Sequence, residues 1–250
     1  MAITAGLVFV CLLGSAAAVA QQPSSPETPM SPKQLAIDIL HDQKPIWTFP
    51  GKAVTGKHWK PILAVAAGTI GLVVTDPYTE RYFHERPSFG GYKTGVLRGR
   101  NTTLAITLTP VAFYLAGLAK QSAHARNTGL LVAEGVIDTQ ILSFVLKNAA
   151  GRLLPSDIPP QGNLRNTWFK YQGSRTNGGS FPSGHTASAF AVATIVSGRY
   201  REHRWIPWVA YGAAAFLSLT RLPAQAHFPS DIFLGAAMGY GIGRFVVLER

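Results

Sequence analysis

Six long apolar stretches dominate this 250-residue sequence. They are rich in Ala, Leu, Val and Gly, and they show little of the polar and apolar alternation that is typical of half-buried strands. The sequence therefore predicts an all-α fold, a helical bundle of about six apolar helices. The stretches cover approximately residues 61–75, 103–119, 129–146, 186–198, 205–220 and 232–248.

The composition of these stretches favours a membrane-embedded bundle. A bilayer crossing needs about 20 predominantly apolar residues, and the stretches are slightly shorter and contain many small residues. Small residues let helices approach closely, and Gly235, Gly239 and Gly243 recur every four residues in the last stretch. We expect close helix packing along that face. A soluble helical bundle, exported to the periplasm, is the alternative.

Basic residues follow every second stretch, which gives the bundle a predicted orientation. By the positive-inside rule, the ends that carry Lys and Arg face the cytoplasm. The ends after the third and fifth stretches then face outward, as expected for a protein of the inner membrane with its outward loops in the periplasm. The residues that set this orientation are Lys120, Arg126, Arg199, Arg201, Arg204 and Arg250.

The first 33 residues differ in composition from the rest. Residues 5–20 are apolar and end in Ala18-Val19-Ala20, as a signal peptidase site requires, so residues 1–20 are predicted to be a signal peptide, with an uncleaved anchor as the alternative. Residues 21–33 are rich in Pro, Ser and Gln and read as a flexible tether before one helical domain, 34–250. An exported amino terminus followed by six crossings would reverse the predicted orientation, unless stretch 61–75 packs without spanning.

The excess of basic over acidic residues limits the classes of binding partner that the sequence suggests. Lys and Arg number 23 against 12 Asp and Glu, although charged residues make up only 14% of the chain. Such a surplus suits nucleic acid, anionic lipids or phosphorylated substrates, and the sequence has no nucleic-acid motif. Cys11 is the only cysteine, so the remainder has no Cys-based metal site. We also expect no cluster of carboxylates for a two-metal hydrolase, and hence no metal or other cofactor.

Three short motifs fall at the ends predicted to face outward. They are Lys147–Pro155 (KNAAGRLLP), Ser180–His185 (SFPSGH) and Thr220–Asp231 (TRLPAQAHFPSD). Helices that alternate in direction bring all three motifs to one face. The cations there, Lys147, Arg152 and Arg221, suit phosphate oxygens. At the start of the helix after Pro182, free N–H groups around Gly184 and the hydroxyl of Ser183 suit a tetrahedral anion.

Two histidines complete the predicted site. Asp231 follows His227 by four residues, one helical turn, where its carboxylate can accept the proton of one ring nitrogen and leave the other free to attack phosphorus. His185 can protonate the leaving oxygen, because its ordinary pKa lies near neutrality. By contrast, Glu134 and Asp138 point away from Lys147 on their helix. We interpret them as buried partners for polar groups.

These residues resemble the type 2 phosphatidic acid phosphatase superfamily, which shares its site with the vanadium haloperoxidases. The family pattern is K-x6-R-P, then P-S-G-H, then S-R-x5-H-x3-D. The resemblance implies that His227 is the nucleophile, His185 the general acid and Asp231 the partner of His227. It further implies that Lys147, Ser183, Gly184 and Arg221 bind phosphate. This chain departs from the pattern twice: Leu154 stands in place of Arg, and Thr220 in place of Ser. Arg152 is the nearest candidate to replace the missing Arg, followed by Arg165, Lys170 and Arg175.

The resemblance implies a membrane phosphatase that hydrolyses a phosphate monoester or diphosphate, such as a lipid phosphate, through a phosphohistidine and without metal. Two alternatives remain: a vanadate-dependent haloperoxidase, or a catalytically impaired lipid-binding protein marked by Leu154. The sequence does not predict the oligomeric state.

Overall fold

The computed structural model describes residues 27–56, 59–86, 99–159, 161–170 and 179–249. Within them it contains seven α-helices and no strand, so the predicted all-α class is confirmed. The helices are α2 (Pro32–Thr55), α3 (Trp59–His84), α5 (Gly99–Ala119), α6 (Ala123–Ala150), α7 (Gly184–Arg199), α8 (Ile206–Leu219) and α9 (Pro229–Ile242). A 3-10 turn, Pro155–Asp157, follows α6, and α9 continues as a π-helical segment, Gly243–Val247.

Each of the six apolar stretches lies in a helix, and α2 is the helix that the sequence did not predict. Its sequence mixes apolar residues with Lys, Asp and Gln and contains Pro45 and Pro50. Because proline inside a helix removes a backbone hydrogen bond, such a segment is not expected to be helical. Ser31 begins the helix as its N-cap, with its side chain accepting from the backbone N–H of Lys33.

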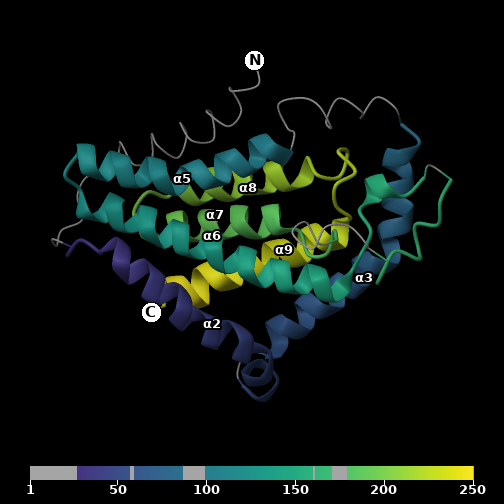
Figure 1. Ribbon diagram of the computed structural model, residues 1–250, viewed down its shortest axis with the longest axis horizontal. Helices are drawn as coiled ribbons and strands as arrows, with labels where there is room; N and C mark the ends of the chain where they lie inside the picture. The colour runs from purple at the N-terminus through teal and green to yellow at the C-terminus, as the bar shows by residue number, and fades with distance from the viewer. Residues whose placement is uncertain (1–26, 57–58, 87–98, 160, 171–178, 250) are drawn as a thin grey trace.

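The helices α5 to α9 lie side by side and form the bundle, while α2 and α3 make a V against one side of it (Figure 1). Most of α7 is buried because α6, α8 and α9 pack around it. The apolar core gathers Val192, Ile195 and Val196 of α7 with residues of the surrounding helices. The bundle is thus built around the helix whose first residues carry the P-S-G-H motif.

Close packing between α7 and α9 depends on the three glycines spaced by four. A Cβ atom at Gly235 would lie 2.6 Å from the Ser183 carbonyl oxygen, and a Cβ atom at Gly239 would lie 2.9 Å from the backbone of Ala187 and of Ala191. A Cβ atom at Gly243 would lie 2.9 Å from the Cβ of Thr194. These distances are shorter than ordinary van der Waals contact. The predicted close approach through this glycine face is therefore confirmed.

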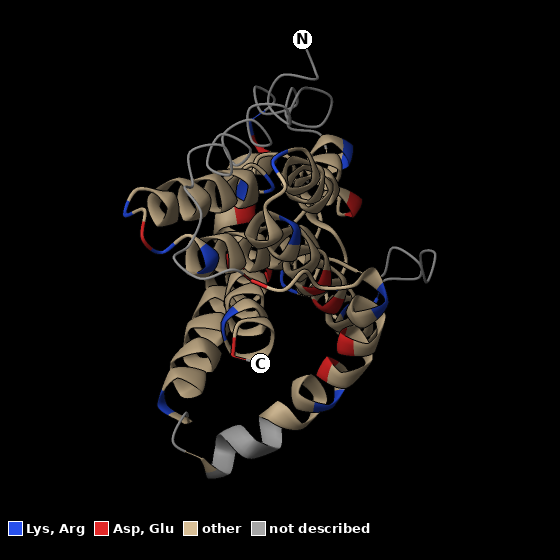
Figure 2. Ribbon diagram, turned by 90° about the vertical axis from the view of Figure 1, so that its left-hand side faces the viewer, with Lys and Arg blue, Asp and Glu red and all other residues tan. Residues whose placement is uncertain are grey.

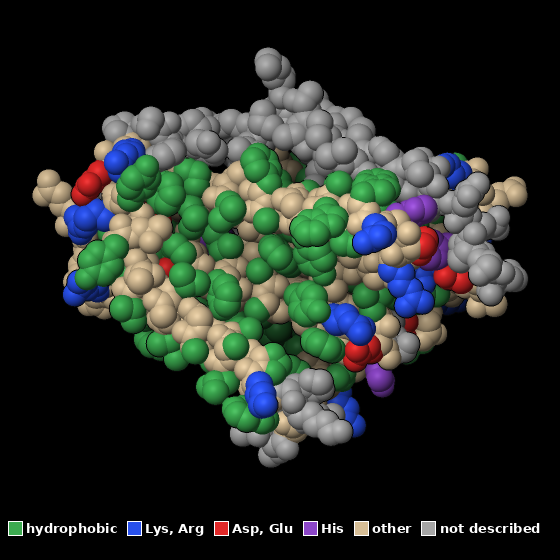
Figure 3. Space-filling view, turned by 180° about the vertical axis from the view of Figure 1, so that it is seen from behind, with side chains coloured by type: hydrophobic (Ala, Val, Ile, Leu, Met, Phe, Trp, Pro, Cys, Tyr) green, Lys and Arg blue, Asp and Glu red, His purple; other side chains and the backbone are tan. Residues whose placement is uncertain are grey.

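Among the residues that the structure describes, three helices are long and apolar enough to cross a membrane. They are α3, α5 and α6 with the turn after it as far as Asp157, with mean hydropathies of 1.4, 1.5 and 1.6. The stretch 61–75 lies in α3, which at 26 residues has the length for a crossing. Large apolar side chains cover much of one outer face, and charged side chains gather toward its left and right edges (Figure 3). Large apolar side chains are exposed on several helices, and Trp208 of α8 is 83% exposed. An apolar surface of this extent suits lipid, as expected for a membrane protein.

The helices alternate in direction, so the bundle has two distinct ends. Between His124 and Lys147, helix α6 rises by about 35 Å, and α7 returns from Gly184 to Arg199. The amino ends of α7 and α9 therefore meet the carboxyl end of α6 at what we call the Lys147 end. The opposite end, which carries Arg199, is the Arg199 end. All three motifs lie at the Lys147 end, as predicted.

Residues 27–31, part of the predicted tether, lie at the Arg199 end. The Glu27 carboxylate accepts hydrogen bonds from Arg199 Nη2 at 2.6 Å and from His124 Nδ1 at 2.8 Å, and the Met30 N–H donates to Asn127 at 2.8 Å. Although burial alone would raise the pKa of Glu27, these partners, above all Arg199, lower it to about 2. We call this group the Glu27 clamp. Residues 1–26 of the predicted signal peptide and tether lie outside the described residues.

The carboxyl-terminal segment returns to the same end. A Cβ atom at Gly198 would meet the Leu248 side chain, so the last described residues pack beside the end of α7. Figure 1 shows the start of α2 and the carboxyl terminus on one side of the bundle. In Figure 2, which views the molecule from that side, Lys, Arg, Asp and Glu are sparse along the helices.

Candidate active site

The amino end of α7 forms the first part of the site. Ser183 is the N-cap, and its hydroxyl oxygen accepts from the N–H and the hydroxyl of Thr186, which leaves the Ser183 O–H itself as a donor. The Ser183 N–H donates to the Asp231 carbonyl at 3.0 Å, which ties this helix start to α9. The N–H groups of Gly184 and His185 lie in the first turn, where a helix has no internal acceptors for them. Such a helix start is suited to bind an anion.

His185 is held by the first turn of α5. Its Nε2 lies 2.8 Å from the Thr103 hydroxyl, a contact that the sequence did not predict. Burial, with the neighbouring His227, Arg221 and Lys147, lowers the pKa of His185 to about 3. The negative charge of a bound phosphate would act in the opposite direction and raise this pKa toward neutrality.

His227 faces His185 across the same end of the bundle. The two ring centroids lie 6.5 Å apart, so both imidazoles can reach one tetrahedral ion between them. His227 Nδ1 lies 2.8 Å from the Ser180 carbonyl oxygen and 3.6 Å from Asp231 Oδ2. The sequence predicted Asp231 as the acceptor for this nitrogen, whereas the closer acceptor is a backbone carbonyl. Either acceptor leaves Nε2 with a free lone pair.

Burial lowers the pKa of His227, although the neighbouring Asp231 acts in the opposite direction. The imidazole is therefore neutral at neutral pH, which is the form that can attack phosphorus. Asp231 is also buried, and burial alone would raise its pKa. His227 and the Arg152 guanidinium outweigh burial and hold the pKa of Asp231 below its ordinary value.

Arg152 lies behind this pair in a buried network of hydrogen bonds. Its guanidinium donates to Asp231 at 2.6 Å, to Asp76 at 2.7 Å and to the Ser230 hydroxyl at 2.8 Å. The guanidinium carbon also lies 3.9 Å from the centre of the Phe228 ring. The sequence predicted Arg152 as a phosphate ligand in place of the Arg missing at Leu154, but these hydrogen bonds join it to two carboxylates instead.

The other predicted cations occupy different positions. Lys147 is half-buried in the last turn of α6, close enough to influence the charge of both histidines. Arg221 is buried, and its guanidinium donates to the Thr220 hydroxyl at 3.0 Å. Arg165 is exposed and donates to the Tyr78 hydroxyl at 2.8 Å, so it lies beside α3. Lys170 is exposed as well, and Arg175 lies outside the described residues.

Three contributors to the site were not predicted: Asp76, Thr103 and the Ser180 carbonyl. Asp76 and Thr103 come from α3 and α5, far from the motifs in sequence. Neither position carries a signal in a single sequence, because a lone Asp or Thr in an apolar helix is commonly a packing residue. Ser180 begins the predicted SFPSGH motif, but its contribution is a backbone oxygen, which no residue type specifies.

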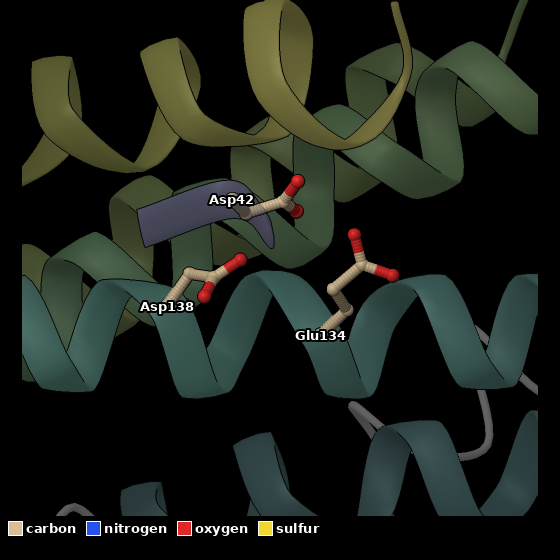
Figure 4. A group of neighbouring side chains, drawn as sticks. All are labelled: Asp42, Glu134 and Asp138. Atoms are coloured by element: carbon tan, nitrogen blue, oxygen red, sulfur yellow. The ribbon is translucent and has the colours of Figure 1, made fainter. Parts of the chain in front are cut away.

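A separate carboxylate cluster lies between α2 and α6. Asp42 of α2 and Glu134 and Asp138 of α6 point toward one another, and their oxygens lie within 4.8 Å, a spacing that would suit a metal ion (Figure 4). The sequence predicted no carboxylate cluster for a two-metal hydrolase, and it did not predict this group of three, because folding brings Asp42 against residues more than 90 positions away. Asp138 accepts from the Gln43 side chain at 2.9 Å, which confirms it as a partner for a polar group. Along α6 the cluster is about 13 Å from Lys147 and thus apart from the histidines.

Comparison with known proteins agrees with this geometry. The PAP2 superfamily model matches residues 128–249. A lipid A 1-phosphatase of Porphyromonas gingivalis is 39% identical over 101 residues, which are 40% of this chain and 22% of that protein. A lipid A 1-phosphatase of Rhizobium etli is 32% identical over 123 residues, 48% of this chain and 49% of that protein.

A lipid A 4'-phosphatase of Bacteroides thetaiotaomicron is 32% identical over 100 residues, 40% of this chain and 43% of that protein. The matched region thus spans less than half the length of each of these relatives. No solved structure matches the chain significantly. Residues 128–249, which contain all three motifs and both histidines, are thus the part of this chain that is similar to the PAP2 superfamily.

Proposed function

We propose that this protein is a membrane phosphatase that removes a phosphate group from a phosphorylated lipid. The observation that supports it most directly is the pair of imidazoles 6.5 Å apart, with His227 Nδ1 held by a carbonyl oxygen. The helix start at Ser183, together with Lys147 and Arg221, supplies donors and positive charge for the phosphate oxygens. The apolar outer face would keep the protein where a lipid substrate resides.

The proposed reaction has two steps. His227 Nε2 attacks phosphorus, the bond from phosphorus to the lipid oxygen breaks, and His185 gives that oxygen a proton. A water molecule, deprotonated by His185, then attacks the phosphohistidine and releases inorganic phosphate with His227 regenerated. Because burial, together with the neighbouring His227, Arg221 and Lys147, lowers the pKa of His185 to about 3, we expect His185 to hold its proton only while the charge of the phosphate is present. This would couple proton uptake to substrate binding.

The relatives suggest which lipid to test first. Their names, lipid A 1-phosphatase and lipid A 4'-phosphatase, refer to phosphates at two positions of one lipid. We propose a phosphorylated glycolipid of this class as the substrate. Phosphatidic acid, phosphatidylglycerol phosphate and undecaprenyl diphosphate serve as the comparison panel.

The test is phosphate release by the purified protein in detergent with a chelator present. We expect wild type to release phosphate from at least one lipid of the panel, His227→Ala to lose the activity, and vanadate to inhibit. His41→Ala is the matched control, because the His41 side chain is 71% exposed and belongs to α2. Activity that survives His227→Ala, or that needs a divalent metal, would overturn the mechanism.

A second candidate function has one observation in its favour. Arg152 donates hydrogen bonds to two carboxylates, an arrangement that does not favour it as the replacement for the phosphate ligand missing at Leu154. A protein that binds a lipid phosphate but hydrolyses it poorly would fit this arrangement. Lipid binding without phosphate release by any variant, Leu154→Arg included, would favour this candidate, and peroxide-dependent halide oxidation with vanadate would favour a haloperoxidase.

A further inference from the structure

Asp76 is a buried carboxylate from a helix that precedes the family-matched region. It lies in α3, whereas the match to the PAP2 superfamily begins at residue 128. Its side chain is fully buried. Buried carboxylates are costly unless they are paired and hydrogen-bonded, and Asp76 satisfies that condition through residues of the site. It accepts from Arg152 at 2.7 Å and from the Ser230 N–H at 3.1 Å, and the Ser230 hydroxyl donates to it as well.

These bonds form a continuous connection from α3 to His227. Arg152 donates to Asp76 through Nη2 and to Asp231 through Nη1, so one guanidinium joins the two carboxylates. Asp231 Oδ2 lies 3.6 Å from His227 Nδ1 and accepts from the Phe228 N–H. The Arg152 guanidinium carbon also lies 4.5 Å from the centre of the Trp168 ring and 3.9 Å from the centre of the Phe228 ring. The side chains of Asp76, Arg152 and Asp231 are therefore held against one another by these hydrogen bonds.

We propose that Asp76 is a positioning residue for His227, acting through Arg152 and Asp231. It does not touch the reacting atoms. Instead, Asp76 fixes the Arg152 guanidinium, and that guanidinium keeps Asp231 beside the His227 imidazole. The proposal rests on the proposed function, because it assigns Asp76 a role in that reaction, and it makes α3 part of the catalytic unit.

Charge gives Asp76 a second effect. Asp76 and Asp231 together carry two negative charges against one positive charge on Arg152, and the excess favours a positive charge on His227 as it attacks phosphorus. Asp76→Asn removes that excess. The charge of Arg152 is then compensated by Asp231 alone, so Asp231 stabilises a positive charge on His227 less. Within the described part of the chain, the other charged or titratable groups beside the two histidines are Lys147 of α6, His185 of α7 and Arg221 after α8. None of these is negative, so none can replace the lost charge.

The experiment compares Asp76→Asn with Glu80→Gln, a matched control on the same helix. Glu80 is one turn further along α3 and equally buried, but its carboxylate lies 3.4 Å from His84 Nδ1. We measure kcat, KM and the pH profile of phosphate release in detergent. Loss of a hydrogen-bonded partner that orients a metal-binding residue typically costs 10–100-fold, and we expect a fall of about that size in kcat of Asp76→Asn, with KM changed less than about twofold. The acid limb of its profile should move to lower pH, and Glu80→Gln should keep the wild-type values.

Two results overturn the proposal while the proposed function stands. One is an active wild type with an Asp76→Asn variant of equal kcat and equal acid limb. The other is an Asp76→Asn variant changed in KM alone. An inactive wild type defeats the proposed function, and with it the reaction in which Asp76 would act.

If Asp76→Asn does not fold, as judged by gel filtration in detergent, Ser230→Ala decides the question. That variant removes one hydroxyl shared by Asp76 and Arg152 and leaves all charges in place. A fall in kcat at unchanged KM supports the positioning role, and an unchanged kcat rejects it.

Discussion

The packing of α9 on α7 makes a sharp prediction for Gly239→Ala. The added methyl would lie 2.9 Å from backbone atoms of Ala187 and Ala191, and closer still to the Ala187 carbonyl oxygen. Ordinary contact for such atoms begins at about 3.5 Å, so the two helices must separate by about 0.6 Å to relieve the 2.9 Å contacts and by more than that to clear the Ala187 carbonyl oxygen. Backbone atoms of a packed helix cannot turn aside as a side chain can. We expect overpacking to cost about 1–3 kcal/mol of unfolding free energy.

The matched control lies two residues further along the same helix. A Cβ atom at Gly241 meets nothing within 4 Å, and alanine is favoured over glycine in helices by about 1 kcal/mol. We therefore expect Gly241→Ala to be neutral or stabilising. Thermal unfolding in detergent measures the difference, at about 2–4 °C for each kcal/mol in a chain of this size.

Gly239→Ala should also reduce activity at temperatures where the protein is folded. His185 and Ser183 lie at the start of α7, and Asp231 at the start of α9, so helix separation changes the spacing of the two imidazoles. Misplacement by about 1 Å can cost as much as 100-fold in rate. Equal melting temperatures and equal kcat for Gly239→Ala and Gly241→Ala would refute the account of α7 and α9 packing.

Two further predictions concern pH. Because burial lowers the pKa of His227, its nucleophilic neutral form persists as pH falls, so the acid limb of kcat/KM should lie below pH 6.5; an apparent pKa above 7 would contradict this. Glu27 has a pKa of about 2 in the folded protein, so the stability it contributes is present above its ordinary pKa of about 4.5 and is lost as pH falls toward 2. Glu27→Gln should therefore cost about 1–2 kcal/mol at pH 7, after allowance for partial exposure, and nothing near pH 2. A cost that does not change with pH would disprove the pairing.

The sequence predicted the helices and the convergence of the motifs because both depend on local pattern. Apolar stretches reveal helices that pack or meet lipid, and alternating helices bring every second connection to one end. The glycine spacing likewise revealed the face of α9 that contacts α7, because close approach requires small residues on one side of a helix. Helix α2 was missed since Pro45 and Pro50 argue against a helix, whereas its packing on α6 and α3 stabilises one.

The residues behind the site could not be predicted, because they act through tertiary contacts. Arg152 was expected to replace the missing phosphate ligand on the basis of its distance from Leu154 in sequence. The structure turns its guanidinium toward Asp76, a residue 76 positions away, and toward Asp231. The cluster of Asp42 with Glu134 and Asp138 could not be predicted for the same reason, because its members meet only when α2 packs on α6. Side-chain direction and long-range contacts decide these cases.

The Glu27 clamp connects the side of the membrane on which residue 27 lies with the leaflet that the site faces. Because Glu27 is bound to Arg199 and His124, residue 27 and both histidines of the site are separated by the length of the bundle. In a bilayer, a signal peptide that carried residue 27 across would leave the phosphate chemistry on the inner leaflet. Lipids of the outward-facing leaflet can meet His227 only if residue 27 stays inside. For this fold, the side of the membrane on which residue 27 lies therefore determines which leaflet supplies the lipids that His227 can reach.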